Sequence, residues 1–171
     1  MPTERDCDHK EFIMKFSDFI VMPAIRADLT ADDKQAVIAE LIASLAEAGV
    51  IKSADQEGIV AAVMRREELG STGIGRGVAV PHTKHPSVER LIGTVGISSE
   101  GVNFNSLDGA KVHLFFLIVS PHDRPSDHLR ALEQITMHLR DDAFCRFLKQ
   151  ARTVQDVQQL LEEADANQFS T

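Results

Sequence analysis

The chain contains no tryptophan and no tyrosine, so its aromatic packing depends on nine phenylalanines. Its two cysteines, Cys7 and Cys145, lie far apart and show no metal-type spacing, which predicts two free thiols in a reducing compartment. No apolar run approaches the roughly 20 residues that span a bilayer. The charged N-terminus has no apolar signal core behind it. These absences predict a cytoplasmic protein that is not inserted into a membrane.

Positive charge is also scarce, because 18 Lys and Arg stand against 26 Asp and Glu, a net charge of -8. Non-specific binding to nucleic acid needs a cationic surface, so this balance argues against nucleic acid as a partner. A hydrophobic fraction of 43% over 171 residues is ordinary for one globular domain. We expect a flexible extension over residues 1–13, one domain over 14–164 and a tail over 165–171.

Segments with helical and with strand periodicity alternate along the chain. Apolar residues recur at helical spacing after Thr30, which is expected to cap a helix that ends at Gly49, and again between Ser53 and Gly70. The segment Lys111–Ser120 is apolar on both faces, as in a central strand. Further strands are expected at 25–29, 78–80 and 91–98, and further helices from Ser126, at 141–150 and at 153–163. The pattern predicts an α/β fold, with a mixed sheet covered by helices on both faces.

One glycine-rich stretch, residues 71–85 (STGIGRGVAVPHTKH), combines several unusual features. Glycines at 73, 75 and 77 allow sharp turns and close approach. Residues 78–80 have the composition of a short strand, and Pro81 then stops regular pairing. His82 follows directly. Because histidine can carry a phosphoryl group as a covalent intermediate, His82 is a candidate nucleophile.

Two other residues are expected to join His82. Arg66 ends the second predicted helix and offers a permanent charge in a forked donor geometry. His128 lies in the first turn of the helix after the central strand, where exposed amides favour an anion. In α/β sheets, sites gather where strand ends meet helix N-termini. The three side chains are therefore predicted to form a site for phosphoryl transfer, which needs positioning and electrostatics.

Each of these residues also has a plainer interpretation. Taken singly, His82 is a surface histidine, Arg66 a solvated helix end and His128 a residue of a helix cap. On composition alone, Arg65 and Arg76 compete with Arg66. Lys84 and His85 lie close enough in sequence to modulate His82. Three further histidines, His113, His122 and His138, are expected on the surface or in strands.

Metal and nucleotide sites are less well supported. A metal site would combine His82 and His85 with His122 or His128, but no carboxylate or cysteine stands at a supporting position. The glycine-rich stretch lacks a following Gly-Lys-Ser/Thr and lacks a Gly-x-Gly-x-x-Gly fingerprint. We therefore expect neither a metal nor a nucleotide cofactor.

The run from Arg66 to His82, REELGSTGIGRGVAVPH, resembles the signature of the fructose/mannitol-type enzyme IIA domain of the bacterial phosphoenolpyruvate-dependent phosphotransferase system. Residues 102–112 and 114–121 resemble the middle segment of that family, and residues 127–132 (DHLRAL) resemble its second histidine motif. The resemblance covers residues 14–164, and several separated motifs agree.

The resemblance implies a role for each candidate residue. His82 matches the phosphorylated histidine of the family, His128 its second active-site histidine and Arg66 its active-site arginine. It implies a mixed sheet of about five strands, a histidine-phosphorylated phosphocarrier protein (HPr/NPr-like) as donor, and transfer without metal or nucleotide. One departure is Thr83, where many members have Gly or Cys, and this difference bears on partner docking.

Three functions stay open at this point. The sequence of residues 104–121 is more similar to the nitrogen-regulatory branch, in which the phosphorylation state controls other proteins. The alternative is a sugar-specific IIA that passes phosphate to a IIB domain for uptake of a fructose- or mannitol-like sugar. Since no IIB, carrier or membrane part stands in the sequence, a stand-alone IIA is expected. The third is a non-phosphorylated interaction module on the same scaffold.

Overall fold

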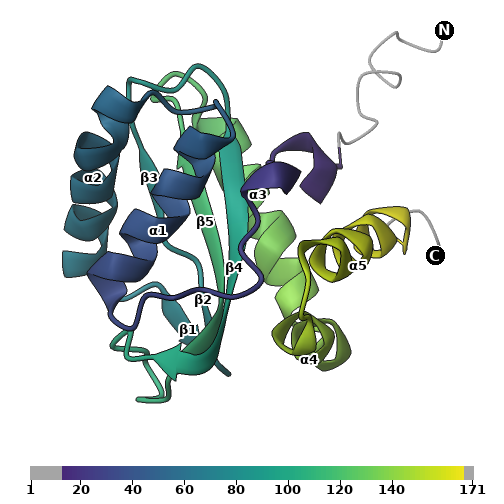
Figure 1. Ribbon diagram of the computed structural model, residues 1–171. Helices are drawn as coiled ribbons and strands as arrows, with labels where there is room; N and C mark the ends of the chain where they lie inside the picture. The colour runs from purple at the N-terminus through teal and green to yellow at the C-terminus, as the bar shows by residue number, and fades with distance from the viewer. Residues whose placement is uncertain (1–12, 168–171) are drawn as a thin grey trace, which may run out of the picture.

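The computed structural model describes residues 13–167, and the extension expected over 1–13 lies outside them apart from Ile13. Figure 1 shows a central sheet with helices on both sides, as the alternating sequence pattern predicts. The helices are α1 (Lys34–Glu47), α2 (Gln56–Glu68), α3 (Pro125–Leu139), α4 (Asp142–Gln150) and α5 (Val154–Asn167), and the strands are β1 (Gly73–Gly75), β2 (Val78–Ala79), β3 (His82–Lys84), β4 (Ile92–Val102) and β5 (Val112–Ser120). None of the helices in the described part is long and apolar enough to cross a membrane.

Strand β5 is the centre of a five-stranded mixed sheet. Strands β2 and β3 both run parallel to it along one edge, with Ala79 opposite Phe115 and His82 opposite Ile118. They are two pieces of one line that is interrupted at Val80 and Pro81, because proline cannot donate to the ladder. Strand β4 pairs antiparallel with the other edge of β5, and β1 pairs antiparallel with β2. The predicted mixed sheet is confirmed.

The side chains of β5 alternate between two hydrophobic cores, which explains why the strand is apolar on both faces. Phe115, Leu117 and Val119 pack against α1 and α2. Leu114, Phe116 and Ile118 face the other way, toward α3, α4 and α5. Both layers therefore bury their apolar stripes on the same strand.

The segment before α1 runs along the outer edge of β4. Single bridges join Ile20 to Gly93 and Arg26 to Gly96, and the amide of Leu29 donates to the carbonyl of Ile97. The strand predicted at 25–29 is therefore wrong as a regular strand, although its backbone is bonded to the sheet edge. Gly96 admits this close approach, because a Cβ there would meet a Leu29 methyl at 2.9 Å.

Two predicted helix starts are also corrected. Asp33, and not Thr30, caps α1 by accepting from the amide of Ala36. Thr30 instead donates its amide and hydroxyl to Glu40, which leaves it outside the helix. Helix α3 begins at Pro125, one residue before the predicted cap Ser126, because proline suits the first helical position, where no amide partner is needed.

The C-terminal helix is longer than expected. Helix α5 continues to Asn167, so the predicted tail over 165–171 is wrong for its first three residues. Asp165 is buried and accepts from the amides of Phe16 and Ser17 at 2.7 and 3.0 Å. This long-range contact ties the two ends of the described chain together.

Candidate functional site

His82 is the first residue of β3, directly after the break in the edge strand. Its ring is half-buried, and its Nδ1 lies 2.7 Å from the carbonyl oxygen of Val80. A carbonyl oxygen only accepts, so Nδ1 carries the proton and donates it. The lone pair of the neutral ring is therefore on Nε2. The Pro81 carbonyl, in turn, accepts from the amide of Ile118, which fixes the broken segment to β5.

His128 lies one turn into α3 and is 8% exposed. Its Nδ1 is 2.5 Å from the hydroxyl oxygen of Ser120, the last residue of β5. The rings of His82 and His128 are 5.3 Å apart, centre to centre, and meet edge to face at 60°. The two predicted histidines are thus brought together, at the edge of the sheet near the carboxyl end of β5.

Both rings are held in the neutral form. Burial lowers the pKa of His82 below its ordinary value, and the charge of Arg66 lowers this pKa further, while the Val80 hydrogen bond and Glu67 raise it. Burial, followed by the charges of His82 and Lys84, lowers the pKa of His128 to about 4. A neutral imidazole is the nucleophilic form, so the site presents His82 with an available lone pair.

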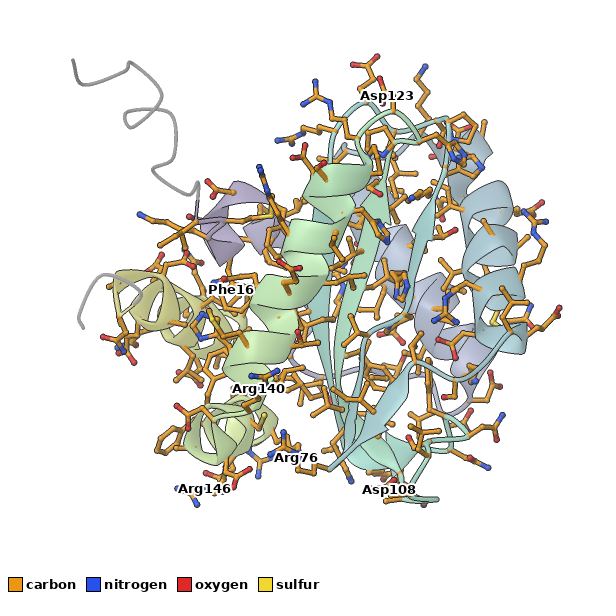
Figure 2. All side chains as sticks on the ribbon, turned by 180° about the vertical axis from the view of Figure 1, so that it is seen from behind. Phe16, Arg76, Asp108, Asp123, Arg140 and Arg146 are labelled. Carbon is orange, nitrogen blue, oxygen red and sulfur yellow. The ribbon has the colours of Figure 1, made fainter. Side chains whose placement is uncertain are left out.

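Arg66 is placed by the last turn of α2. Its guanidinium donates to the carbonyl of Gly70 at 2.9 Å and is close enough for its charge to act on His82. Of the competitors, Arg65 is exposed on the same helix. Arg76 binds Asp142, and Figure 2 shows it at the opposite end of the molecule from Asp123, whose loop joins β5 to α3. Arg66 is therefore the arginine that the fold brings to His82.

A buried ionic group supports this side of the site. Glu67 accepts from the amide and hydroxyl of Thr72 and pairs with Lys34 at 3.0 Å. The Thr72 carbonyl accepts from the amide of Val80, whose own carbonyl holds His82. A continuous set of bonds thus runs from Lys34 to the His82 ring. The side chain of Glu67 is 2% exposed, so its charge depends on these partners.

The other histidines in the described part of the chain lie in separate surroundings. His85 bonds Ser87, and His113 lies 2.9 Å from the carbonyl of Ser98. His122 is exposed in the loop before α3, and His138 packs against the rings of both Phe16 and Phe144. Between residues 13 and 167 no three His, Cys, Asp or Glu side chains gather as a metal site requires.

Sequence reasoning missed Glu67 and Ser120. A signal for Glu67 was present, because Ile59, Val63 and Glu67 are spaced by four and fall on one buried face of α2. A charged residue at a buried helical position is expected to have a partner. Ser120 gave a weaker signal, since a hydroxyl at the end of an apolar strand is common, and its contact with α3 depends on how the helix returns to the sheet.

This architecture is that of an α/β protein, with a mixed sheet between two helical layers and two histidines side by side at the sheet edge. The profile of the family described as "Phosphoenolpyruvate-dependent sugar phosphotransferase system, EIIA 2" matches residues 19–164. The chain therefore belongs to this EIIA type-2 family, whose members are phosphoryl-transfer components of the phosphotransferase system.

Relatives come from two branches. The nitrogen regulatory protein of Bradyrhizobium diazoefficiens is 32% identical over 148 residues, which are 86% of this chain and 95% of that protein. The fructose-specific EIIABC component of Bacillus subtilis is 31% identical over 152 residues, 89% of this chain but 24% of the larger protein.

Solved structures agree on the fold. The crystal structure of the nitrogen regulatory protein IIA-Ntr from Neisseria meningitidis has a TM-score of 0.77 at 24% identity and covers 85% of this chain and 98% of its own. The IIA protein in the complex of mannitol enzyme IIA with phosphorylated enzyme IIB from Escherichia coli has a TM-score of 0.69 at 22% identity, covering 82% and 95%.

Proposed function

We propose that this chain is a phosphohistidine carrier of the nitrogen-regulatory type, in which His82 accepts a phosphoryl group from a histidine-phosphorylated phosphocarrier protein (HPr/NPr-like). The observation that carries the proposal is the hydrogen bond from His82 Nδ1 to the Val80 carbonyl. It leaves Nε2 as the nitrogen with a free lone pair, on a half-buried ring at the sheet edge. A fixed, neutral and reachable imidazole nitrogen is what such a carrier needs.

The transfer is an in-line displacement. The Nε2 lone pair of His82 forms a bond to phosphorus while the bond from phosphorus to the donor's histidine breaks, and the donor ring keeps that electron pair. Arg66 turns from the Gly70 carbonyl to the phosphoryl oxygens, for which its planar fork is well suited. His128 donates a ring N–H to the same group. The charge of Arg66 and the hydrogen bond from His128, both directed at the phosphoryl oxygens, are the main catalytic contribution.

The regulatory branch is favoured by the nitrogen regulatory protein of Bradyrhizobium diazoefficiens, 95% of whose length this chain matches. The second function is a fructose- or mannitol-specific IIA component that passes phosphate to a IIB domain. It is supported by the fructose-specific relative and by the solved complex of mannitol IIA with phosphorylated IIB. The two functions share the first step and differ in the acceptor.

The first step is tested by intact mass. Purified protein is incubated with phosphoenolpyruvate, the first phosphotransferase enzyme and the phosphocarrier, for the wild type, His82→Ala and the control His85→Ala. The expected result is an acid-labile gain of one phosphate, about 80 Da, on the wild type and the control, and none on His82→Ala. Full phosphate uptake by His82→Ala would refute the assignment. No uptake by any of the three would favour an interaction module.

The acceptor is tested by adding a purified fructose- or mannitol-type IIB domain to the phosphorylated protein. In a regulatory protein the phosphate is expected to stay on His82. The IIB domain then gains little phosphate in the time that the phosphocarrier needs to phosphorylate His82. Transfer to IIB at the loading rate would instead establish the sugar-uptake function. Loading of this chain by HPr and by NPr, compared at equal concentration, sharpens the distinction.

A further inference from the structure

The hydroxyl of Ser120 is fully buried at the end of β5, next to His128. Among residues 13–167, its hydrogen bond is the one to His128 Nδ1, at 2.5 Å. The Ser120 backbone is held separately, because its carbonyl accepts from the amide of His85 and the residue pairs with Lys84 of β3. The backbone bonds therefore do not involve the hydroxyl, which bonds His128 alone among the described residues.

Hydrogen-bond accounting then decides where the proton of His128 lies. A serine hydroxyl has one hydrogen to donate, and a buried hydrogen without an acceptor is costly. If Nδ1 carried the proton, the ring would donate to Ser120, and the serine hydrogen would have no acceptor among the described groups. If the hydroxyl donates to Nδ1, every hydrogen at this contact is used. The ring proton of neutral His128 is then on Nε2.

We propose that Ser120 is a positioning residue that holds His128 in the Nε2–H form, as a neutral donor to a phosphoryl group on His82. The inference rests on the proposed function, since it takes the phosphoryl group to be on His82. The ring of His128 meets that of His82 edge to face at 5.3 Å, and its Nδ1 edge is occupied by Ser120. Nε2–H is therefore the donor that remains for the phosphoryl oxygens.

The same contact also affects how readily the ring of His128 becomes charged. When a doubly charged phosphoryl group arrives, it favours the protonated form of a neighbouring imidazole. A protonated ring needs an acceptor at Nδ1, and a hydroxyl can turn from donor to acceptor without moving its oxygen. A carbonyl, such as the one beside His82, accepts only. That turn leaves the serine hydrogen without an acceptor among the described groups, so the contact with Ser120 favours the neutral ring of His128 even beside a phosphoryl group.

The first test reads the proton directly. Ring nitrogen shifts of His128, recorded by NMR at pH 7.5 on unphosphorylated protein, distinguish Nδ1–H from Nε2–H. The expected spectrum has the proton on Nε2 and a hydrogen-bonded Nδ1 acceptor, whose resonance moves in Ser120→Ala. A wild-type ring with its proton on Nδ1 would overturn the proposal. This measurement needs no phosphate donor.

The second test measures transfer. Ser120→Ala is expected to accept phosphate on His82 with full stoichiometry but about tenfold more slowly, the effect of one hydrogen bond near a charge. Ser120→Thr keeps the hydroxyl in a strand and is expected to restore the rate. Ser44→Ala, which removes another buried serine hydroxyl on α1, is the control and keeps the wild-type rate.

The outcomes separate the inference from the function on which it rests. A wild-type rate in Ser120→Ala, with phosphate on His82, would overturn the role of Ser120 and leave the carrier function standing. Failure of the wild type to take phosphate would refute the carrier function, while the NMR result still decides the protonation of His128. If Ser120→Ala does not fold, Ser120→Thr and the wild-type spectrum still decide the proposal.

Discussion

The two histidines of the site are supported by different kinds of side chain. On the side of α2, His82 is supported by charge, because Arg66 is close and the buried pair of Glu67 and Lys34 holds the loop before it. On the side of α3, His128 is supported by a neutral hydroxyl, and burial keeps it uncharged. One side provides fixed charge, and the other provides a neutral hydrogen-bond donor.

For the phosphoryl transfer proposed above, this difference suits a group that is first bound and then released. A site made of fixed cations alone would bind a phosphoryl group tightly and release it slowly, since binding the ground state and the transition state equally well does not raise the rate. A neutral donor adds stabilisation that grows as charge develops on the phosphoryl oxygens. The predictions that follow disturb one side at a time, from the largest expected free-energy effect to the smallest.

The largest expected effect is a loss of stability on the charged side of the site. Glu67→Ala leaves Lys34 and Thr72 without their acceptor and is expected to lower the free energy of unfolding by about 4 kcal/mol. Glu68→Ala, an exposed neighbour on the same helix, is expected to stay within about 0.5 kcal/mol of the wild type. Urea unfolding measures both. Equal stability of the two variants would mean that the ionic group does not anchor the loop.

The neutral side is expected to respond to pH. Burial holds the pKa of folded His128 at about 4, whereas the ordinary value in an unfolded chain is 6.5. Between these values the unfolded chain binds more protons, so stability is complete above pH 6.5 and falls as the pH drops toward 4, by up to about 3 kcal/mol. Burial lowers the pKa of His82 and His138 as well, so they act in the same direction.

The share of His128 is isolated by substitution. Urea unfolding at pH 7 and pH 4.5 is compared for the wild type and His128→Gln, which has no titrating ring. The loss of stability between the two pH values is expected to be smaller in the variant. An unchanged loss would show that His128 is not held neutral by the fold.

Removal of the neutral donor is expected to lower the rate of phosphoryl transfer but not the amount of phosphate that His82 finally carries. His128→Gln is expected to accept one phosphate on His82 but to exchange it with the phosphocarrier about a hundredfold more slowly, because one donor to the transition state is misplaced. His122→Gln, an exposed histidine in the loop before α3, is the control. Rapid-quench measurement of exchange decides the matter, and a wild-type exchange rate in His128→Gln would remove His128 from the mechanism.

The smallest effect is expected from a change of cation that keeps the charge. Arg66→Lys is expected to slow phosphoryl transfer about tenfold, since lysine lacks the planar fork that holds two phosphoryl oxygens. Arg65→Lys, at the exposed neighbouring position, is expected to leave the rate unchanged. The same rapid-quench assay applies, and equal rates for the two variants would mean that Arg66 acts as charge alone.

Much of the fold could be predicted from the local sequence pattern of apolar residues and proline. The double-sided apolar run of β5 predicted a central strand, and the break at Pro81 predicted the position of His82. Helix ends were less predictable, because several polar residues precede α1 and only the fold shows that Asp33 caps it while Thr30 bonds Glu40. The end of α5 was missed for a similar reason, since the partners of Asp165 lie 148 and 149 residues away.

The sequence by itself determined the kinds of element, the stretch that carries His82, and the residues competent for phosphoryl chemistry, because these depend on composition, periodicity and short-range spacing. The tertiary structure decided which arginine accompanies His82, which buried carboxylate anchors its loop, and which nitrogen of each histidine is occupied. Those features depend on hydrogen bonds across elements, such as Lys34 with Glu67 and Ser120 with His128. Such contacts exist only after the sheet and its two helical layers have packed, since only packing removes the water that would otherwise satisfy these groups.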